Sequence, residues 1–297
     1  MSNIELLCSI RSKLSREQKF YLIQEILEKE GNYHKNLKVI HVAGTAGKGS
    51  TCNMISQVLV NRGYKVAQLI SPHTIRINER ISINSNEISN KDLNLYLDYF
   101  FSKYPGLSFR MYLTLVAIKY FYDNKVDYFV CEVFSGGRYD TTNIFENIAC
   151  VLTSAGLDHI NLFGNSIDNI IYEDMGIARP NVPFFTRIEN KIIKEEANKI
   201  GAKLNIIKSK VNTNLIGTHQ KENANLAYEV LKYIGLDDSF IRENLNKIKY
   251  KGRLQYIEKN IILDCAHNVI GFERLFSYIK RINFDKLYCC ICNLKIK

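Results

Sequence analysis

The glycine-rich stretch VAGTAGKGST, residues 42–51, is the feature that most restricts how this chain can fold. An apolar run precedes it and a helix-like segment follows it, which predicts a strand, a tight loop and a helix. Such a loop lets backbone N–H groups approach an anion closely, and the start of the helix adds its positive end. We therefore expect this loop to bind the phosphates of a nucleoside triphosphate.

One glycine in the loop does not fit the common pattern. The usual phosphate-binding loop has Ser or Thr directly after its lysine, whereas Gly49 separates Lys48 from Ser50 here. Lys48 still has the reach to contact outer phosphates, and Ser50 or Thr51 is placed to face Mg²⁺. The residues expected to contact the nucleotide are Gly44, Thr45, Gly47, Lys48, Gly49, Ser50 and Thr51.

Apolar runs alternate with helix-like segments along most of the chain. This alternation is typical of an α/β fold with a largely parallel sheet flanked by helices, which binds ligands at the carboxyl ends of its strands. The predicted strands are 38–43, 65–71, 126–133, 148–156, 182–188 and 203–207. The predicted helices are 15–30, 50–63, 108–123, 190–200 and 219–234.

The length of the chain favours roughly two domains. We expect an ATP-binding domain over 1–249 and an incomplete C-terminal α/β domain over 250–297. The second unit is predicted to contain a helix at 271–282 and strands at 254–258, 261–266 and 286–292. So small a unit rarely carries a core alone, so we expect it to be mobile or docked on the first domain.

Composition excludes several classes of partner. The formal net charge is +10, but Lys and Arg are dispersed without a basic stripe, so we expect no nucleic-acid partner. No stretch approaches the roughly eighteen apolar residues of a membrane span, and the first thirty residues contain no signal-like run. We expect no membrane partner and a cytoplasmic location. The eight cysteines lie mostly inside apolar runs, which indicates reduced, buried thiols.

Polar stretches follow three of the predicted strands. They are SPHTIRINER (71–80), EVFSGGRYDTTN (132–143) and GLDHINLFG (156–164). A carboxylate such as Glu132, at a strand end beside a phosphate loop, is well placed to hold Mg²⁺, and His159 is a candidate second ligand. Each signal is weak alone, because a single loop histidine is more often structural.

The order of the motifs is more specific than any one of them. GTAGKGST, the three polar stretches, YEDMGIARP, GTHQKENANLA, KGRLQ and DCAHNVIG together resemble the folylpolyglutamate synthase and dihydrofolate synthase family, a branch of the Mur ligase superfamily. The resemblance runs along essentially the whole chain and implies a Mur ligase central-domain-like fold for the first domain. The family loop reads GTNGKGST, so Gly49 is a family feature and only Ala46 differs.

The resemblance implies a ligase that forms an amide through an acyl phosphate. ATP would transfer its γ-phosphate to a carboxylate of a folate, either tetrahydrofolate or dihydropteroate, and the amine of L-glutamate would then attack. Members of the family are mostly monomeric, so a monomer is expected. By resemblance, Ser71, Glu132 and His159 are metal ligands. Lys48, His159, Asp174 and His267 are catalytic, and Gln220, Asn223, Arg253 and Asp264 contact the nucleotide.

The chain departs from the family pattern at several positions. The family motif EKAGI has a carbamylated lysine where this chain has Asp174, whose carboxylate we expect to replace that metal-supporting group only in part. The other departures lie close to binding loops: Phe134, Ser135, Ser154, Ala155 and Val269.

Three alternatives fit the motifs to different degrees. Asp174 and the short second domain favour a nucleotide-binding remnant without turnover, whereas the intact Lys48, Glu132 and His267 argue against it. A Mur-type ligase acting on a cell-wall precursor is disfavoured, because SPHTIRINER resembles the folate branch. A P-loop kinase does not explain DCAHN.

Overall fold

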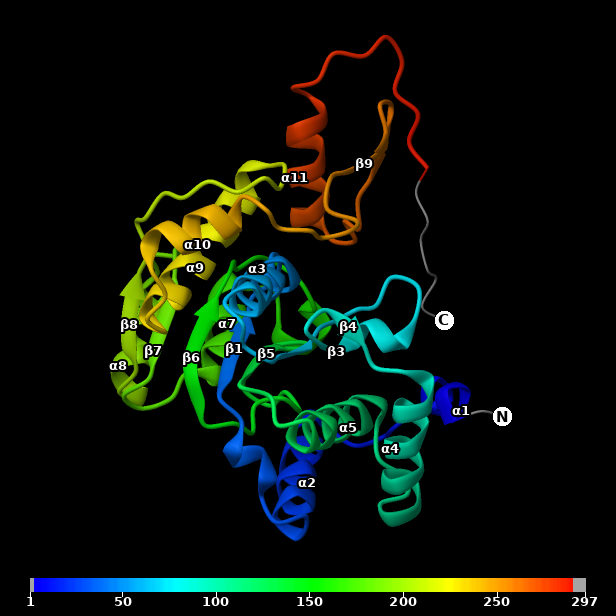
Figure 1. Cartoon of the computed structure of the whole chain (residues 1–297). Coiled ribbons are helices and arrows are strands. Elements are labelled where there is room, and N and C mark those ends of the chain that lie inside the picture. The colour runs from blue at the N-terminus through cyan, green and yellow to red at the C-terminus, as the bar shows by residue number, and fades with distance from the viewer. Residues whose placement is uncertain (1–2, 291–297) are drawn as a thin grey trace.

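The main body is an eight-stranded sheet with helices on both faces (Figure 1). We describe a computed structural model of the chain over residues 3–290. The strand order is β4-β3-β2-β5-β1-β6-β7-β8. The strands are β1 (Val39–Ala43), β2 (Val66–Leu69), β3 (Ile81–Ile83), β4 (Asn86–Glu87), β5 (Tyr128–Glu132), β6 (Asn147–Leu152), β7 (Pro183–Thr186) and β8 (Lys203–Ile206).

The sheet is parallel except at one edge. Neighbouring strands pair in parallel in the series β2-β5-β1-β6-β7-β8. Strand β3 pairs antiparallel with β2, and β4 pairs antiparallel with β3. All six predicted strands of the first domain are confirmed. Most of their ends lie one to four residues inside the predicted bounds, and β6 begins one residue earlier than predicted. The short strands β3 and β4 were not predicted, because two or three residues carry no readable alternation.

The six predicted helices are confirmed with ends within three residues of the predicted bounds, and the other helices were not predicted. The α-helices are α1 (Asn3–Ser9), α2 (Arg16–Lys29), α3 (Lys48–Asn61), α4 (Asn90–Lys103), α5 (Phe109–Asp123), α6 (Ile160–Phe163), α7 (Ile167–Asp174), α8 (Lys191–Ile200), α9 (Thr218–Tyr233), α10 (Asp238–Leu245) and α11 (Val269–Ile279). Short 3₁₀ turns are η1 (Tyr33–Asn36), η2 (Ile77–Arg80) and η3 (Met175–Ile177). Within residues 3–290, no helix combines the length and apolar character needed to cross a bilayer.

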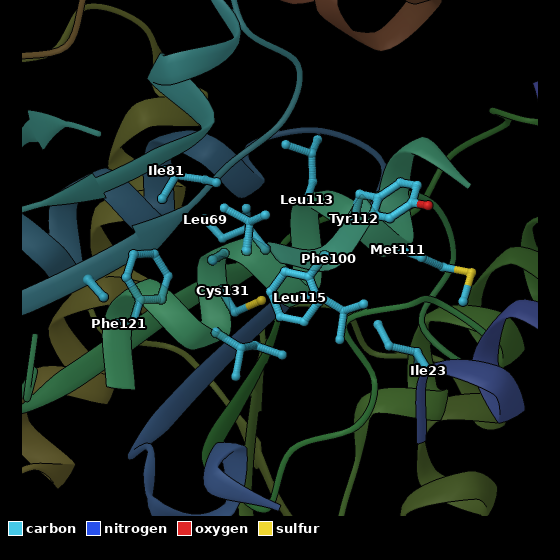
Figure 2. Close-up of a cluster of buried hydrophobic side chains, with 14 of the residues drawn as sticks. Ile23, Leu69, Ile81, Phe100, Met111, Tyr112, Leu113, Leu115, Phe121 and Cys131 are labelled. Atoms are coloured by element: carbon cyan, nitrogen blue, oxygen red, sulfur yellow. The ribbon is translucent and has the colours of Figure 1, made fainter. Parts of the chain in front are cut away.

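Side chains alternate between the two faces of the sheet and build a separate core on each. On β1, Val39 packs with α2, α4 and α5, whereas Ile40 and Val42 pack with α3, α9 and α10. Figure 2 shows part of the first core, where Cys131 of β5 joins residues of α4 and α5. Burial on both faces is what parallel strands require, and it holds the strand ends that carry the polar loops in fixed positions.

The chain beyond residue 250 forms a second, small unit. Strands β9 (Gln255–Glu258) and β10 (Ile261–Leu263) pair antiparallel, and α11 follows them. Figure 1 shows this hairpin and α11, in orange and red, standing apart from the main sheet. Asn268 Nδ2 donates to Asp158 Oδ2 at 3.1 Å, so the unit is docked on the first domain.

The predicted strand at 286–292 is wrong over residues 286–290, which have no regular structure, and its last two residues lie outside the described range. Its apolar run resembles a strand locally, but a strand also needs a neighbour to pair with. The burial expected for all thiols is likewise only partly confirmed. Cys52, Cys131 and Cys150 are buried, whereas Cys8 and two thiols near the C-terminal end of the described range are exposed.

The start of α2 offers a test of local stability. Ser15 caps this helix, because its hydroxyl accepts from the Gln18 N–H at 3.1 Å and the Gln18 side chain accepts from the Ser15 N–H at 2.8 Å. We expect Ser15→Ala to lower the free energy of unfolding by about 1 kcal/mol, measured by urea denaturation. The same change at Ser102, exposed inside α4, should alter it by less than about 0.5 kcal/mol. Equal effects at both positions would contradict the capping role.

Candidate active site

The phosphate-binding loop joins β1 to α3 and needs glycine at two positions where the backbone has a positive φ. Gly44 has φ +128° and Gly47, which precedes the first residue of α3, has φ +88°. A Cβ at Gly44 would collide with Thr153 Oγ1, and one at Gly47 would collide with Asn223 Oδ1. The loop therefore lies closely against the end of β6 and against α9.

Gly49 is glycine because of the space around it rather than because of its backbone conformation. A Cβ at Gly49 would lie 2.7 Å from the Tyr250 hydroxyl and 3.3 Å from Glu132 Oε2. Gly49 thus makes room for a phenol and a carboxylate against the first turn of α3. This crowding answers why Lys48 and Ser50 are not adjacent in this chain.

Lys48 is the first residue of α3, and its ammonium donates a hydrogen bond to the Gly44 carbonyl at 2.7 Å. The N–H groups of the first helical turn have no partners within the helix and carry its positive end, which suits an anion. Thr51 is fully buried, and its Oγ1 makes no hydrogen bond to any described residue. These groups form a cradle whose donors fit phosphate.

A cavity of about 790 Å³ opens beside this loop. Most of the residues predicted from the sequence line it: Thr45, Gly47, Lys48, Gly49, Ser50, Ser71, Glu132, His159, Gln220, Asn223, Arg253, Asp264 and His267. Gly44, Thr51 and Asp174 do not line it, although the first two belong to the loop. Segments from both sides of residue 250 therefore meet at one site.

The cavity wall also contains basic side chains that sequence reasoning missed. Arg11, Arg80, Arg110 and Arg274 line it together with Lys48 and Arg253, and they outnumber the carboxylates of Glu132, Asp158 and Asp264. Of these four, only Arg80 belongs to one of the polar motifs, and no local pattern marks the others. A cavity with this charge balance favours ligands that carry several negative charges.

Glu132 ends β5 and is the most buried carboxylate of the cavity, at 3% exposure. Its Oε2 accepts from the Ser71 N–H at 3.2 Å. Burial raises the pKa of Glu132, while the nearby Lys48 ammonium acts in the opposite direction. A buried carboxylate beside a serine is an oxygen donor set that suits Mg²⁺ or Mn²⁺. Within residues 3–290 no group of three or more His, Cys, Asp and Glu side chains forms a metal cage by itself.

The two predicted histidines line the cavity from different units. His159 is exposed, with a positive φ of 49°, and its ring meets the Phe163 ring edge to face at 6.2 Å between centroids. His267 is also exposed, and its Nδ1 lies 3.0 Å from the Cys265 carbonyl oxygen. Neither imidazole forms an ion pair with a described residue, and in His267 the Nε2 is the nitrogen left for a ligand, because the Nδ1 already contacts the carbonyl.

The remaining predicted contacts are held by local hydrogen bonds. Asn223 Nδ2 donates to Gln220 Oε1 at 3.1 Å on α9. Asp264 accepts from the N–H groups of Leu254 and Ala266, each at 2.8 Å. The Asp264 carboxylate therefore shapes the turn that carries Arg253, in addition to lining the cavity.

Several departures from the family pattern make contacts with one another. Ser154 Oγ accepts from the Ala46 N–H and donates to the Ala46 carbonyl, both at 2.9 Å. Arg110 donates to Ser135 Oγ at 2.5 Å and lies over the Phe134 ring, 5.6 Å from its centroid. The substitutions thus form two local sets that keep the loop and the cavity wall ordered.

Asp174 is the last residue of α7 and does not belong to the cavity wall. It is 3% exposed, and burial raises its pKa to about 7, with Lys48 acting in the opposite direction. The backbone around it packs tightly, since a Cβ at Gly137 would lie 2.7 Å from the Asp174 carbonyl oxygen. Position 137 therefore has to be glycine for the end of α7 to lie where it does.

The raised pKa predicts how stability depends on pH. The folded state binds the Asp174 proton more tightly than the unfolded chain, so stability falls as pH rises from about 4 to about 7. Asparagine cannot titrate, so Asp174→Asn removes this loss. We expect the difference in free energy of unfolding between the variant and the parent chain to be roughly 1–3 kcal/mol more favourable to the variant at pH 8 than at pH 4. Urea unfolding with EDTA at both pH values measures it. Asp285→Asn, an exposed position, should show no such difference.

Comparison with known proteins adds a family assignment to this geometry. No protein-family model matches the chain. The dihydrofolate synthase/folylpolyglutamate synthase of Bacillus subtilis is 30% identical, over 87% of this chain and 71% of the relative. The dihydrofolate synthetase of Saccharomyces cerevisiae is 29% identical over the same shares. The human mitochondrial folylpolyglutamate synthase is 33% identical over 65% of this chain and 37% of the relative.

Solved structures agree with the sequence relatives. Folylpolyglutamate synthase of Thermotoga maritima has a TM-score of 0.79 and 29% identity, covering 94% of this chain and 74% of the other. FolC of E. coli, solved in complex with ADP, has a TM-score of 0.83 and 26% identity over 95% and 74%. A bifunctional folylpolyglutamate synthase/dihydrofolate synthase with Mn, AMPPNP and L-glutamate bound also reaches 0.83, with 26% identity over 95% and 75%.

The expected fold is thereby confirmed, since these neighbours share the Mur ligase-like arrangement of a largely parallel sheet and flanking helices. The sequence similarity extends over most of the chain and over more than two thirds of the Bacillus subtilis relative. The chain belongs to the folylpolyglutamate synthase/dihydrofolate synthase family of ligases.

Proposed function

We propose that this chain is an ATP-dependent ligase that adds L-glutamate to a folate through an acyl phosphate. The observation that carries the proposal is one cavity lined by a phosphate-binding loop, a buried carboxylate and several arginines. Relatives named for both folate reactions support the substrate class. Structures of relatives with ADP or with AMPPNP, Mn and L-glutamate support the co-substrates.

The loop and the first turn of α3 would bind the nucleotide. Lys48 would exchange its hydrogen bond to the Gly44 carbonyl for the outer phosphates, and Gln220 and Asn223 would contact the nucleotide from α9. Glu132, Ser71 and His159 would hold Mg²⁺, which neutralises phosphate charge when bound. Asp174, which does not line the cavity, would support this set only indirectly. In such a reaction, positioning and charge neutralisation supply most of the rate.

The folate carboxylate would be held by the basic part of the wall. Arg80 lies over the Phe109 ring at 5.3 Å and Arg110 over the Phe134 ring at 5.6 Å. Rings and guanidinium groups side by side suit a ligand that is aromatic at one end and carboxylated at the other. The cavity volume lies within the range of small-molecule sites.

Residues after 250 would complete the site. Arg253, Asp264 and His267 line the cavity opposite the loop, which supports a domain boundary near residue 250 and a C-terminal unit that closes over the nucleotide. We also propose that the chain acts as a monomer in the cytoplasm, as the family resemblance implies.

A second candidate is a nucleotide-binding protein without ligase turnover. The observation that favours it is the position of Asp174, which lies outside the cavity wall and has a raised pKa. A carboxylate that is partly protonated near neutral pH is a weak substitute for a permanently charged metal-supporting group.

Mass spectrometry of the products separates the two candidates. Purified protein is incubated with ATP, Mg²⁺, L-glutamate and either tetrahydrofolate or dihydropteroate. A product heavier by one glutamyl unit identifies the ligase and its substrate. No product in either mixture, from a protein that binds ATP in the same buffer, identifies the nucleotide-binding remnant.

A further inference from the structure

The segment that leads into the C-terminal unit is fixed up to residue 249. Asn214 exchanges two hydrogen bonds with the backbone of Ile248, at 2.8 and 3.0 Å. Gln57, on α3, does the same with Lys249, at 2.6 and 3.0 Å. These two side-chain amides hold consecutive residues, one of them directly to the helix that follows the phosphate loop.

The backbone changes direction immediately after these two amide contacts. Gly252 has φ +67° and Leu254 has φ +46°, both in the left-handed region. The Gly252 carbonyl already accepts from the Cys265 N–H at 3.0 Å and the Leu254 N–H donates to Asp264, so from Gly252 on the chain belongs to the second unit. Tyr250 and Lys251 are therefore the connection at which the two units can change their relative position.

Tyr250, the first residue of this connection, touches the phosphate loop. Its hydroxyl and Glu132 Oε2 both face the small space beside Gly49. The Arg253 guanidinium lies over the Tyr250 ring, 5.1 Å from its centroid, and lines the cavity. Burial raises the pKa of Tyr250 to about 12, so the hydroxyl keeps its proton and can donate.

We infer that Tyr250 is a positioning residue that couples occupancy of the phosphate loop to the placement of Arg253 and the C-terminal unit. The Tyr250 hydroxyl lies beside Gly49 and Glu132, so it would shift toward the phosphates of a bound nucleotide. The Tyr250 ring would move with it and reposition the Arg253 guanidinium that lies over the ring. This role rests on the proposed nucleotide site. The connecting segment would thus transmit nucleotide binding to the C-terminal unit, a role that the loop motif does not predict.

Trypsin offers a direct readout, because Lys251 is exposed within the connection. The experiment measures the cleavage rate after Lys251 with and without saturating Mg-ADP, and the Mg-ADP affinity by calorimetry. In the parent chain, we expect Mg-ADP to slow cleavage at least about fivefold. In Tyr250→Phe, which keeps the ring and loses the hydroxyl, affinity should fall by about 2- to 10-fold, as for one hydrogen bond, and protection at saturation should disappear.

Two further variants distinguish coupling from damage to the fold. Tyr233→Phe, at an exposed tyrosine of α9, should behave like the parent chain. Gly49→Ala places a methyl group against the Tyr250 hydroxyl and should speed cleavage without nucleotide, whereas Gly49→Ala with Tyr250→Phe should restore the parent rate.

The outcomes separate this inference from the proposed function. A saturated Tyr250→Phe protein that is protected like the parent chain overturns the coupling, as does a saturated parent chain that shows no protection, or Gly49→Ala cleaved at the parent rate. A parent chain that does not bind Mg-ADP overturns the nucleotide site itself, and the coupling with it.

Discussion

Replacing Lys48 with alanine is expected to lower the affinity for Mg-ATP and the rate of glutamate addition by about 100- to 1,000-fold. The ammonium is the one cation of the loop itself and has only a carbonyl partner, at 2.7 Å, so it is available to a phosphate. The variant should fold, because the side chain holds no ion pair among the described residues. Calorimetric titration with Mg-ATP and the mass-spectrometric assay measure the two losses.

The chain offers a matched control for this change. Lys191 is the first residue of α8, as Lys48 is of α3, but its side chain is 85% exposed and pairs only with Glu195. Lys191→Ala removes the same charge from the same helical position and should leave nucleotide affinity unchanged. Comparable losses in both variants would mean that total charge, rather than the loop, determines binding.

The second large effect is expected at Glu132. Glu132→Gln keeps the size of the side chain and an oxygen for the Ser71 N–H, but it removes the charge that a divalent cation needs. We expect the Mg²⁺ concentration for half-maximal nucleotide binding to rise about 100-fold or more, since even indirect changes around a metal cost 10- to 100-fold.

Although Glu132→Gln should weaken Mg²⁺ binding, it should increase the free energy of unfolding at high pH. The pKa of Glu132 is raised by burial, so the folded state binds its proton more tightly and loses stability as pH rises. A neutral glutamine avoids this loss, and Glu132→Gln should be as stable as the parent chain at pH 4 and more stable at pH 8. The exposed Glu258→Gln is the control. A variant that loses stability at pH 8 and keeps its Mg²⁺ response would refute the proposed metal role.

The loop and the positions of six strands along the chain were readable from short windows. The strand, loop and helix over Val39–Asn61 follow from local preferences, because glycines with positive φ and a buried apolar run need no distant information. The carboxyl ends of β5 and β6 could likewise be assigned polar loops that meet at one edge of the sheet. Glu132 and His159 were predicted on this ground, and both line the cavity.

Contacts between distant residues were not readable in this way. Arg110 reaches Ser135 from α5, and Tyr250 reaches Gly49 from the connection between the two units. The absence of a strand over 286–290 has the same origin, since strand formation depends on a pairing partner elsewhere in the chain.

By itself, the sequence determined the parallel α/β framework and the phosphate-binding loop, because hydrophobic period and glycine conformation act over a few residues. Only the tertiary structure decided which charges share the cavity, why Gly49 must be glycine and where Asp174 lies. Burial and electrostatic fields depend on atoms brought together from all parts of the chain, so they exist only once it has folded.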